Sequence, residues 1–304
     1  MPPRSPLPSR HGLAAAWMRT PDRHQDGPPW PTMAAWLEHR LAAHADVGEM
    51  LADERLVYDD LRPVGADDPY APHTFVWFHR DLRDEVEVPG EIRILHRDER
   101  IVVVDKPAFL STIPRGQHVV QSVVVRLRAQ LDLPELTPLH RLDRVTSGVL
   151  LMATERRWRG PYQTLFEHRR VSKTYRALAA WQAALESPVV VRNHLRKERG
   201  ALRAEVVPDA PVNAETLVEM EARDGDLAVY RLSPRTGRTH QLRLHLAGLG
   251  SPIVGDPLYP TVTDASVDDF SRPLQLIASE LRFTDPVDGA DRRFVSDRTF
   301  PLRP

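Results

Sequence analysis

The residues best suited to chemistry lie in a short polar string, HRLDRVTSG, which spans residues 140–148 and contains Asp143. An apolar run at residues 149–153 follows at once and predicts a buried strand. Reactive side chains are often displayed at the ends of such rigid elements, and the neighbouring cations Arg141 and Arg144 would hold the Asp143 carboxylate ionised. The string therefore indicates either a catalytic carboxylate or a structural ion pair at a turn capped by Thr146 and Ser147.

A second polar string, RTGRTHQLRLH, spans residues 235–245 at the start of an expected helix over residues 240–250. It contains three arginines, two histidines and a glutamine. A helix N-terminus combined with arginines suits a phosphate or a partner carboxylate. Leucines at 242, 244 and 246 indicate a largely buried segment, in which arginines need partners, and the alternative is a solvated basic helix face.

Four strings of this chain resemble the motifs of the RluA-type pseudouridine synthases, which modify ribosomal and transfer RNA. HRLDRVTSGVLLMA resembles the family signature. The other three, in the family's order around it, are IVVVDKPAFLS, VSKTYRALAAW and RTGRTHQLRLHLAGLGSPIVGDPLY. The resemblance covers roughly residues 92–286.

The resemblance implies a role for each matching position. Asp143 corresponds to the essential catalytic aspartate, and Arg243 to the arginine that pairs with it. Tyr175 corresponds to the tyrosine that packs on the target base and assists removal of its carbon-5 proton, and Arg141 to a residue that fills the gap left by the flipped base. The implied reaction isomerises uridine without oxidation or an entering group, so no cofactor and no metal are expected.

RNA contact must rest on local clusters of cations, because the formal net charge of the chain is −1. Basic residues flank Tyr162 and Phe166, and a second basic run at residues 192–203 is either another RNA-contacting patch or a solvated surface. The side chains predicted to contact RNA are Arg141, His140, Arg144, Arg238, His240, Gln241, Arg169, Arg170 and Lys173.

The elements that must position these residues alternate irregularly between strand-like and helix-like runs, which favours an α+β fold over a doubly wound sheet. With the family resemblance, we expect a central, mostly antiparallel mixed sheet flanked by helices. The expected divisions are a flexible Pro-rich leader at residues 1–30, a small N-terminal domain at 31–88 and the catalytic domain at 89–304. The N-terminal domain begins with a helical run from Thr32 and is either a degenerate RNA-binding module or a structural extension.

Three positions depart from the family pattern. Ile277 and Asp285 stand where relatives usually carry histidines, and Pro260 stands where a glycine is common. We interpret Ile277 and Asp285 as structural substitutions, because the core motif residues are present.

Composition excludes several classes of function. The chain has no cysteine, which removes disulfides, thiolate metal sites and cysteine nucleophiles. No run of eighteen apolar residues is present and the N-terminal apolar patch lacks a proper signal-peptide core, so we expect a cytoplasmic protein without membrane contact. The expected partner is structured RNA, no small-molecule cofactor is expected, and a monomer is the default state.

Two other hypotheses remain open at this point. One is an RNA-binding or ribosome-assembly factor that has lost catalysis, although Asp143, Tyr175 and Arg243 are all present. The other is a hydrolase with an aspartate nucleophile, such as a glycosidase, although no paired carboxylate is evident close to Asp143 in the sequence.

Overall fold

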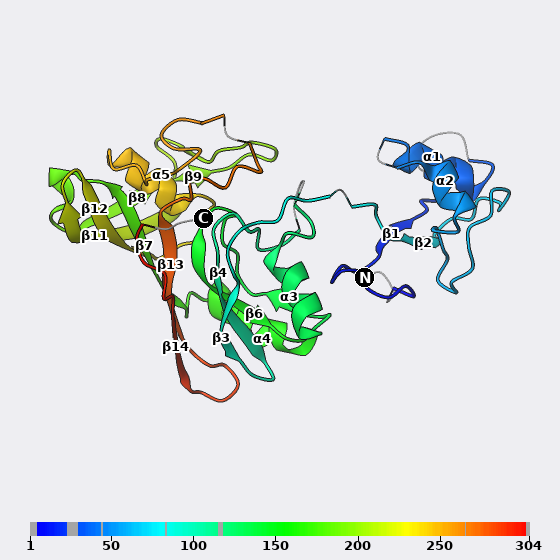
Figure 1. The fold of residues 1–304 in the computed structure, drawn as a ribbon, viewed down its shortest axis with the longest axis horizontal. Helices are drawn as coiled ribbons and strands as arrows, with labels where there is room; N and C mark the ends of the chain where they lie inside the picture. The colour runs from blue at the N-terminus through cyan, green and yellow to red at the C-terminus, as the bar shows by residue number, and fades with distance from the viewer. Residues whose placement is uncertain are drawn as a thin grey trace. The chain divides into compact units, whose positions relative to one another are not determined.

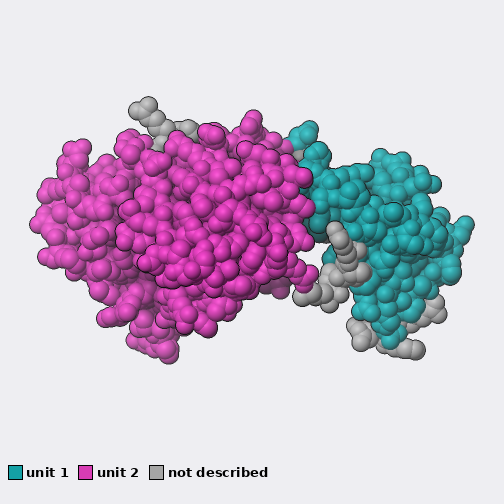
Figure 2. Space-filling model, turned by 90° about the horizontal axis from the view of Figure 1, so that it is seen from below, with its two compact units in different colours: residues 1–84 teal, residues 85–304 magenta. Residues whose placement is uncertain are grey.

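The structure is a computed structural model of the 304-residue chain that describes residues 5–22, 30–43, 45–82, 84–114, 118–264 and 266–301. The chain divides into two compact units (Figures 1 and 2), unit 1 at residues 1–84 and unit 2 at residues 85–304. Their hydrophobic cores are separate.

Unit 1 combines two short helices with a two-stranded antiparallel sheet. Its elements are β1 (Ala16–Arg19), α1 (Met33–Leu41), α2 (Val47–Ala52) and β2 (Phe75–Phe78). Thr32 caps α1 by accepting a hydrogen bond from the Ala35 amide at 3.1 Å, as its residue type predicts. The helical run expected from Thr32 is nevertheless two helices, because Asp46 accepts a hydrogen bond from the Glu49 amide at 3.0 Å and starts α2 as a new helix.

The expectation of a flexible leader at residues 1–30 needs correction for β1. This strand pairs with β2, with Trp17 opposite Trp77. Ala16 and Met18 point to the other face and pack against the core of unit 1. The apolar alternation of these residues therefore outweighs the surrounding prolines, and this part of the segment is folded.

Unit 2 contains a ten-stranded sheet in which one pair, β6 with β13, is parallel and the other strand pairs are antiparallel. The order is β3-β4-β6-β13-β7-β12-β11-β8, with β14 paired to β13 and β5 to β6. The strands are β3 (Arg93–Arg97), β4 (Ile101–Lys106), β5 (Thr137–Pro138), β6 (Ser147–Ala153), β7 (Ser172–Ala180), β8 (Val189–Asn193), β11 (Ala214–Asp224), β12 (Leu227–Pro234), β13 (Leu276–Thr284) and β14 (Asp291–Val295). A separate short ribbon joins β9 (Leu195–Arg196) to β10 (Glu205–Val206). The mostly antiparallel mixed sheet expected from the sequence is confirmed.

Few helices flank this sheet (Figure 1). They are α3 (Val123–Leu131), α4 (Arg156–Glu167), the 3-10 turn η1 (Ala183–Leu185) and α5 (Gln241–Gly248). Tyr162 and Leu165 of α4 pack into a core shared with β4, β6 and β13. Helix α4 ends at Glu167, and Arg169, two residues later, has a left-handed backbone with φ of 56°.

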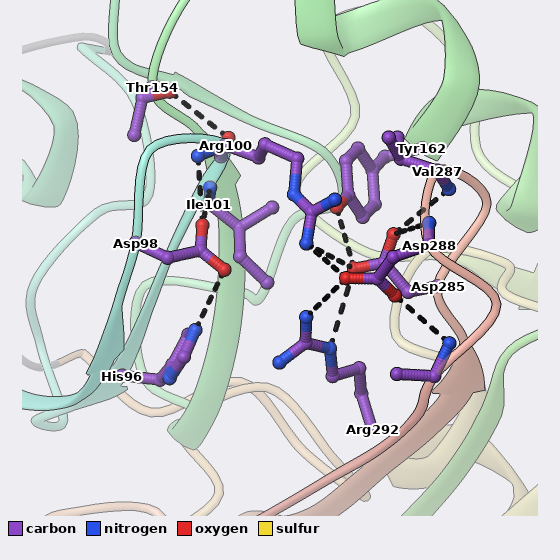
Figure 3. Close-up of polar contacts among 11 residues, drawn as sticks. His96, Asp98, Arg100, Ile101, Thr154, Tyr162, Asp285, Val287, Asp288 and Arg292 are labelled. Atoms are coloured by element: carbon purple, nitrogen blue, oxygen red, sulfur yellow. Dashed lines mark hydrogen bonds and ion pairs between the residues drawn. The ribbon is translucent and has the colours of Figure 1, made fainter.

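A buried carboxylate, Asp285, ties α4 to the β3–β4 turn and the β13–β14 hairpin (Figure 3). The Tyr162 hydroxyl donates to it at 2.8 Å, and the Val287 amide donates at 3.0 Å. The guanidinium groups of Arg100 and Arg292 lie 3.6 and 3.4 Å from it. This bonding agrees with the structural role expected for Asp285.

Candidate active site

The loop that carries Asp143 joins β5 to β6, and the side chains of Thr112 and Lys106 hold it in place. The Thr112 hydroxyl donates to the Leu142 carbonyl at 2.9 Å and accepts from the Leu142 amide at 3.1 Å. The fully buried Lys106 ammonium donates to the Arg144 carbonyl at 3.1 Å and to the Leu110 carbonyl at 2.7 Å. These bonds hold the backbone on both sides of Asp143, which pre-organises its carboxylate.

Lys106 also contributes a charge beneath the loop. Burial lowers the pKa of its ammonium well below the ordinary value, and the negative charge of Asp143 opposes that effect. The sequence placed Lys106 in a family-like string without giving it a role. Its position is that of a support for the Asp143 loop.

The end of the loop requires glycine at position 148. Gly148 has φ of 111°, and a Cβ added there would lie 2.3 Å from the Ala278 carbonyl oxygen. The glycine lets β6 approach β13 closely where the two strands run parallel. The Asp143 loop is thereby joined directly to the centre of the sheet.

Arg243 of α5 lies between two carboxylates. Its guanidinium is 3.5 Å from Asp143, and it donates to Asp256 through Nε at 2.8 Å and through Nη2 at 2.6 Å. The side chains of Arg243 and Asp256 are 2% and 1% exposed, whereas that of Asp143 is 33% exposed. Burial alone lowers the pKa of Arg243, but the hydrogen bonds and charge of Asp256, with the charge of Asp143, raise it overall.

Asp256 is a site residue that the sequence analysis did not identify. Its Oδ1 also accepts hydrogen bonds from the amides of Leu258 and Tyr259, at 2.8 and 3.1 Å. The visible signal was the turn-forming string GDPLY, in which Gly255 has φ of 76°. Asp256 anchors Arg243 so that one edge of the guanidinium faces Asp143.

Tyr175 lies on β7, opposite Ala278 of β13 and Leu232 of β12. Its side chain is partly exposed. Burial raises the pKa of its phenol, and the nearby charge of Asp143 raises it further. The structure therefore brings Tyr175 and Arg243 together around Asp143, and the Tyr175 hydroxyl keeps its proton at neutral pH.

His240 begins α5 and is half-buried, with a left-handed backbone at φ of 58°. Its Nδ1 lies 3.0 Å from the hydroxyl of Tyr259, whose ring also lies 5.4 Å from the Arg243 guanidinium carbon. Burial lowers the pKa of His240 to about 4, although the charge of Asp143 opposes this shift. His240 is therefore neutral at pH 7 and supports the wall of the site.

Three of the predicted RNA contacts are engaged inside the protein. His140 accepts a hydrogen bond from the Leu151 amide at 3.1 Å, and burial lowers its pKa to about 3. Arg144 donates to the Val267 carbonyl at 3.0 Å. Gln241 is 4% exposed and bonds Thr236, Arg238, Glu215 and Thr216. The polar atoms of these three residues hold the motif loops in place, and their contact with RNA stays a prediction.

The other predicted cations face outward. Arg141, Arg169, Arg170 and Arg238 are exposed, and Lys173 is partly exposed. Arg238 donates to the Asn213 carbonyl at 3.2 Å. Within the described parts of the chain, the side chains of the remaining four have no hydrogen bond or ion pair. These four cations are available to an anionic ligand.

The described residues contain neither a metal-binding cluster nor a membrane-spanning helix. No group of three or more histidine, aspartate or glutamate side chains there could hold a metal ion. No helix in the same residues is long and apolar enough to cross a membrane.

The chain is similar to proteins of one family. A family model described as RNA pseudouridylate synthase matches residues 100–248. Pseudouridylate synthase RPUSD2 from Homo sapiens is 36% identical over 186 residues, which are 59% of this chain and 33% of that protein. Dual-specificity RNA pseudouridine synthase RluA from Yersinia pestis is 31% identical over 220 residues, which are 68% of this chain and 99% of RluA.

Among solved structures, human RNA pseudouridylate synthase domain containing 1 is similar in fold. The TM-score is 0.56 at 27% sequence identity, and the match covers 69% of this chain and 86% of that one. The family match includes all three residues that meet at Asp143.

Proposed function

Because the chain belongs to the RNA pseudouridylate synthase family, we propose that it isomerises a uridine of ribosomal or transfer RNA with Asp143, Tyr175 and Arg243. The observation that carries this assignment is the contrast in bonding around Arg243. Asp256 is buried and accepts two hydrogen bonds from the guanidinium, whereas Asp143 is a third exposed and, among the described residues, has one ion pair, at 3.5 Å. A carboxylate held in position but incompletely bonded can act on a substrate.

The reaction breaks the bond between carbon 1′ of the ribose and nitrogen 1 of uracil, turns the base, and joins carbon 1′ to carbon 5. The carbon-5 proton is then lost, and a proton is regained at nitrogen 1, so atoms and electrons balance without a redox partner. Asp143 acts on the ribose, either by attacking carbon 1′ or by removing the 2′-proton. In both routes the Arg243 guanidinium stabilises the negative charge of Asp143 by Coulomb attraction.

Tyr175 supplies an aromatic surface beside Asp143 for the everted base. Taking a base out of its stack costs a few kcal/mol, and one stacking contact returns about 1–3 kcal/mol. Because the raised pKa keeps its phenol protonated, Tyr175 can assist removal of the carbon-5 proton after the base has turned only if its own proton moves to another acceptor in the same step.

The RNA backbone is held by the exposed cations around the same loop. Arg141 lies two residues from Asp143, and Arg169 and Arg170 follow α4. The ring of Phe166, near the end of α4, stacks on His140 with centroids 5.0 Å apart, so these segments meet beside the Asp143 loop. Arginines without protein partners suit phosphate contacts.

The geometry disfavours a hydrolase with two catalytic carboxylates. Asp256 is the second carboxylate at Arg243, but it is 1% exposed and accepts four hydrogen bonds. A general acid must reach the substrate, and Asp256 is buried with both carboxylate oxygens bonded inside the protein.

Two experiments test the function. Purified protein should release tritium from RNA labelled with [5-³H]uridine, since carbon 5 loses its hydrogen in the reaction. Pseudouridine maps of ribosomal and transfer RNA from cells with and without the gene should differ at discrete uridines. Absence of both tritium release and of any mapped difference would refute the assignment. We further propose a cytoplasmic monomer, to be tested by cell fractionation and by molar mass in solution.

A further inference from the structure

Lys173 is a partly buried cation beside the proposed site. It lies on β7 two residues before Tyr175, so both side chains emerge on the same face of the sheet about 7 Å apart along the strand. Within the part of the chain that the structure describes, its ammonium has no hydrogen bond or ion pair. Burial lowers the pKa of Lys173, and no neighbouring carboxylate opposes this shift.

The ammonium lies where the two motif loops come together. A Cβ added at Gly237, in the loop before α5, would lie 3.4 Å from the Lys173 Nζ. On the other side, the charge of Lys173 contributes to the lowered pKa of His140, after the larger effect of burial. His140 begins the string that holds Asp143, and Gly237 precedes the helix that holds Arg243.

The absence of a described partner is informative because the two buried cations of the site, Arg243 and Lys106, are paired. Arg243 bonds two carboxylates, and Lys106 donates to three backbone carbonyls. Removing a cation from water without a counter-charge costs free energy, so a partly buried ammonium left unpaired indicates a ligand that supplies the anion. A bulky side chain at position 237 would also crowd this space, and glycine leaves it open.

We propose that Lys173 binds a phosphate oxygen of the RNA backbone next to the everted uridine, and so fixes the ribose over Asp143 while Tyr175 holds the base. This inference rests on the proposed function. Lys173 and Tyr175 lie about 7 Å apart along β7, so one can contact the backbone and the other the base of the same nucleotide. A lysine ammonium suits this role, because it binds a phosphate as a point charge.

The test compares Lys173→Met and Lys173→Arg with Arg93→Met as the matched control. Arg93 is an exposed cation on β3, which three strands separate from β7, and it also lacks a described partner. The probe is bulk cellular RNA labelled with [5-³H]uridine, taken from cells that lack the gene. Tritium release and filter-binding affinity are measured for each protein over a series of potassium chloride concentrations.

Lys173→Met should lower kcat/KM about tenfold to a hundredfold, as expected for one charge-assisted hydrogen bond. The slope of log affinity against log salt should become shallower by about 0.7, which corresponds to one phosphate contact on a single strand. Lys173→Arg should recover most of the activity and the full slope, and Arg93→Met should match the wild type. Lys173→Met should not lower the melting temperature, since no described bond is lost.

Wild-type activity and salt slope in Lys173→Met would overturn the proposal. A loss of activity with an unchanged salt slope would also overturn it, because it would indicate a contact with an uncharged base oxygen or a structural effect. If the wild-type protein releases no tritium, the proposed function fails, whereas the salt slope of RNA binding still tests Lys173 separately.

Discussion

Two aspartates of unit 2, Asp285 and Asp143, each form a cluster with arginine, and the two clusters differ in how fully the carboxylate is bonded. Asp285 is 1% exposed and is contacted by a tyrosine hydroxyl, by backbone amides and by two guanidinium groups. Asp143 is a third exposed, and its side chain has one described contact, the ion pair with Arg243 at 3.5 Å.

The difference shows that aspartate paired with arginine can either join segments of the fold or leave a carboxylate open to a substrate. A fully bonded carboxylate joins segments of the fold, and it has no lone pair left for a substrate. At the other cluster, Asp256 takes the fully bonded position, and this leaves the carboxylate of Asp143 open on one side. Each cluster also faces a tyrosine, Tyr162 at Asp285 and Tyr175 at Asp143.

The two tyrosines give the largest expected contrast. Tyr175→Phe should reduce turnover about a hundredfold to ten-thousandfold, the usual contribution of general acid–base catalysis, while RNA affinity is retained because the ring remains. Tyr162→Phe should leave turnover unchanged and lower only the melting temperature, because its hydroxyl bonds Asp285. Single-turnover tritium release and filter binding measure both. Equal turnover of the two variants would remove the distinction between the clusters.

Asp256→Ala should affect stability and activity together. The variant leaves a 2% exposed guanidinium with Asp143 as its sole described carboxylate partner, and breaking a buried pair costs about 3–5 kcal/mol in the free energy of unfolding. Turnover of the folded fraction should also fall, because Arg243 loses its orientation. Urea unfolding with tritium release tests this, and full turnover by the folded variant would show that Arg243 needs no anchor.

Asp285→Ala should affect stability alone. Loss of this carboxylate removes the hydrogen-bond partner of Tyr162 and one of the two carboxylate partners of Arg100 and Arg292, and we expect a decrease of about 3 kcal/mol in the free energy of unfolding. Turnover per folded molecule should equal that of the wild type. A specific loss of turnover at a temperature where the variant is folded would contradict a purely structural role.

The smallest expected effect is on pH dependence, through His245. This residue is 1% exposed and lies 2.9 Å from the Thr216 hydroxyl and 3.0 Å from the Asn193 side-chain oxygen, and burial lowers its pKa to about 4. The unfolded chain binds a proton near pH 6.5, so this contribution to stability is complete above that pH and is lost as the pH falls toward 4. At pH 5, protonation of His245 in the unfolded chain should lower the free energy of unfolding by about 2 kcal/mol.

The measurement is the pH dependence of unfolding for His245→Gln against the wild type. The variant should be less stable at pH 7 but should lose less stability between pH 6.5 and 5. Parallel curves for the two proteins would show that His245 does not titrate in this range.

The sequence predicted the central site because its residues lie in contiguous strings. Asp143, Tyr175 and Arg243 each stand within such a string, and the structure brings all three together. Asp256 was missed because its importance depends on a bond across 13 residues to Arg243, which its own turn-like string does not reveal. Residue type alone does not show that His140 accepts from a backbone amide and that Gln241 donates to a backbone carbonyl, so these bonds could not be predicted.

The fold was predictable where apolar periodicity was strong. The buried strands β4 and β6 follow from continuous apolar runs. The break between α1 and α2 was missed because it depends on a local cap at Asp46, and β1 because prolines surround it. In β11, every second residue is buried, namely Ala214, Thr216 and Val218, which is typical of a strand. The charged residues on the other face of β11 obscured this pattern in the sequence.

The most direct test is single-turnover tritium release by Asp143→Asn, measured with its RNA affinity. Asparagine keeps the size of the side chain and removes the charge that faces Arg243. We expect tritium release to fall to the rate without enzyme while RNA affinity and melting temperature stay close to those of the wild type. Turnover by this variant near the wild-type rate would show that the Asp143 carboxylate does not perform the reaction.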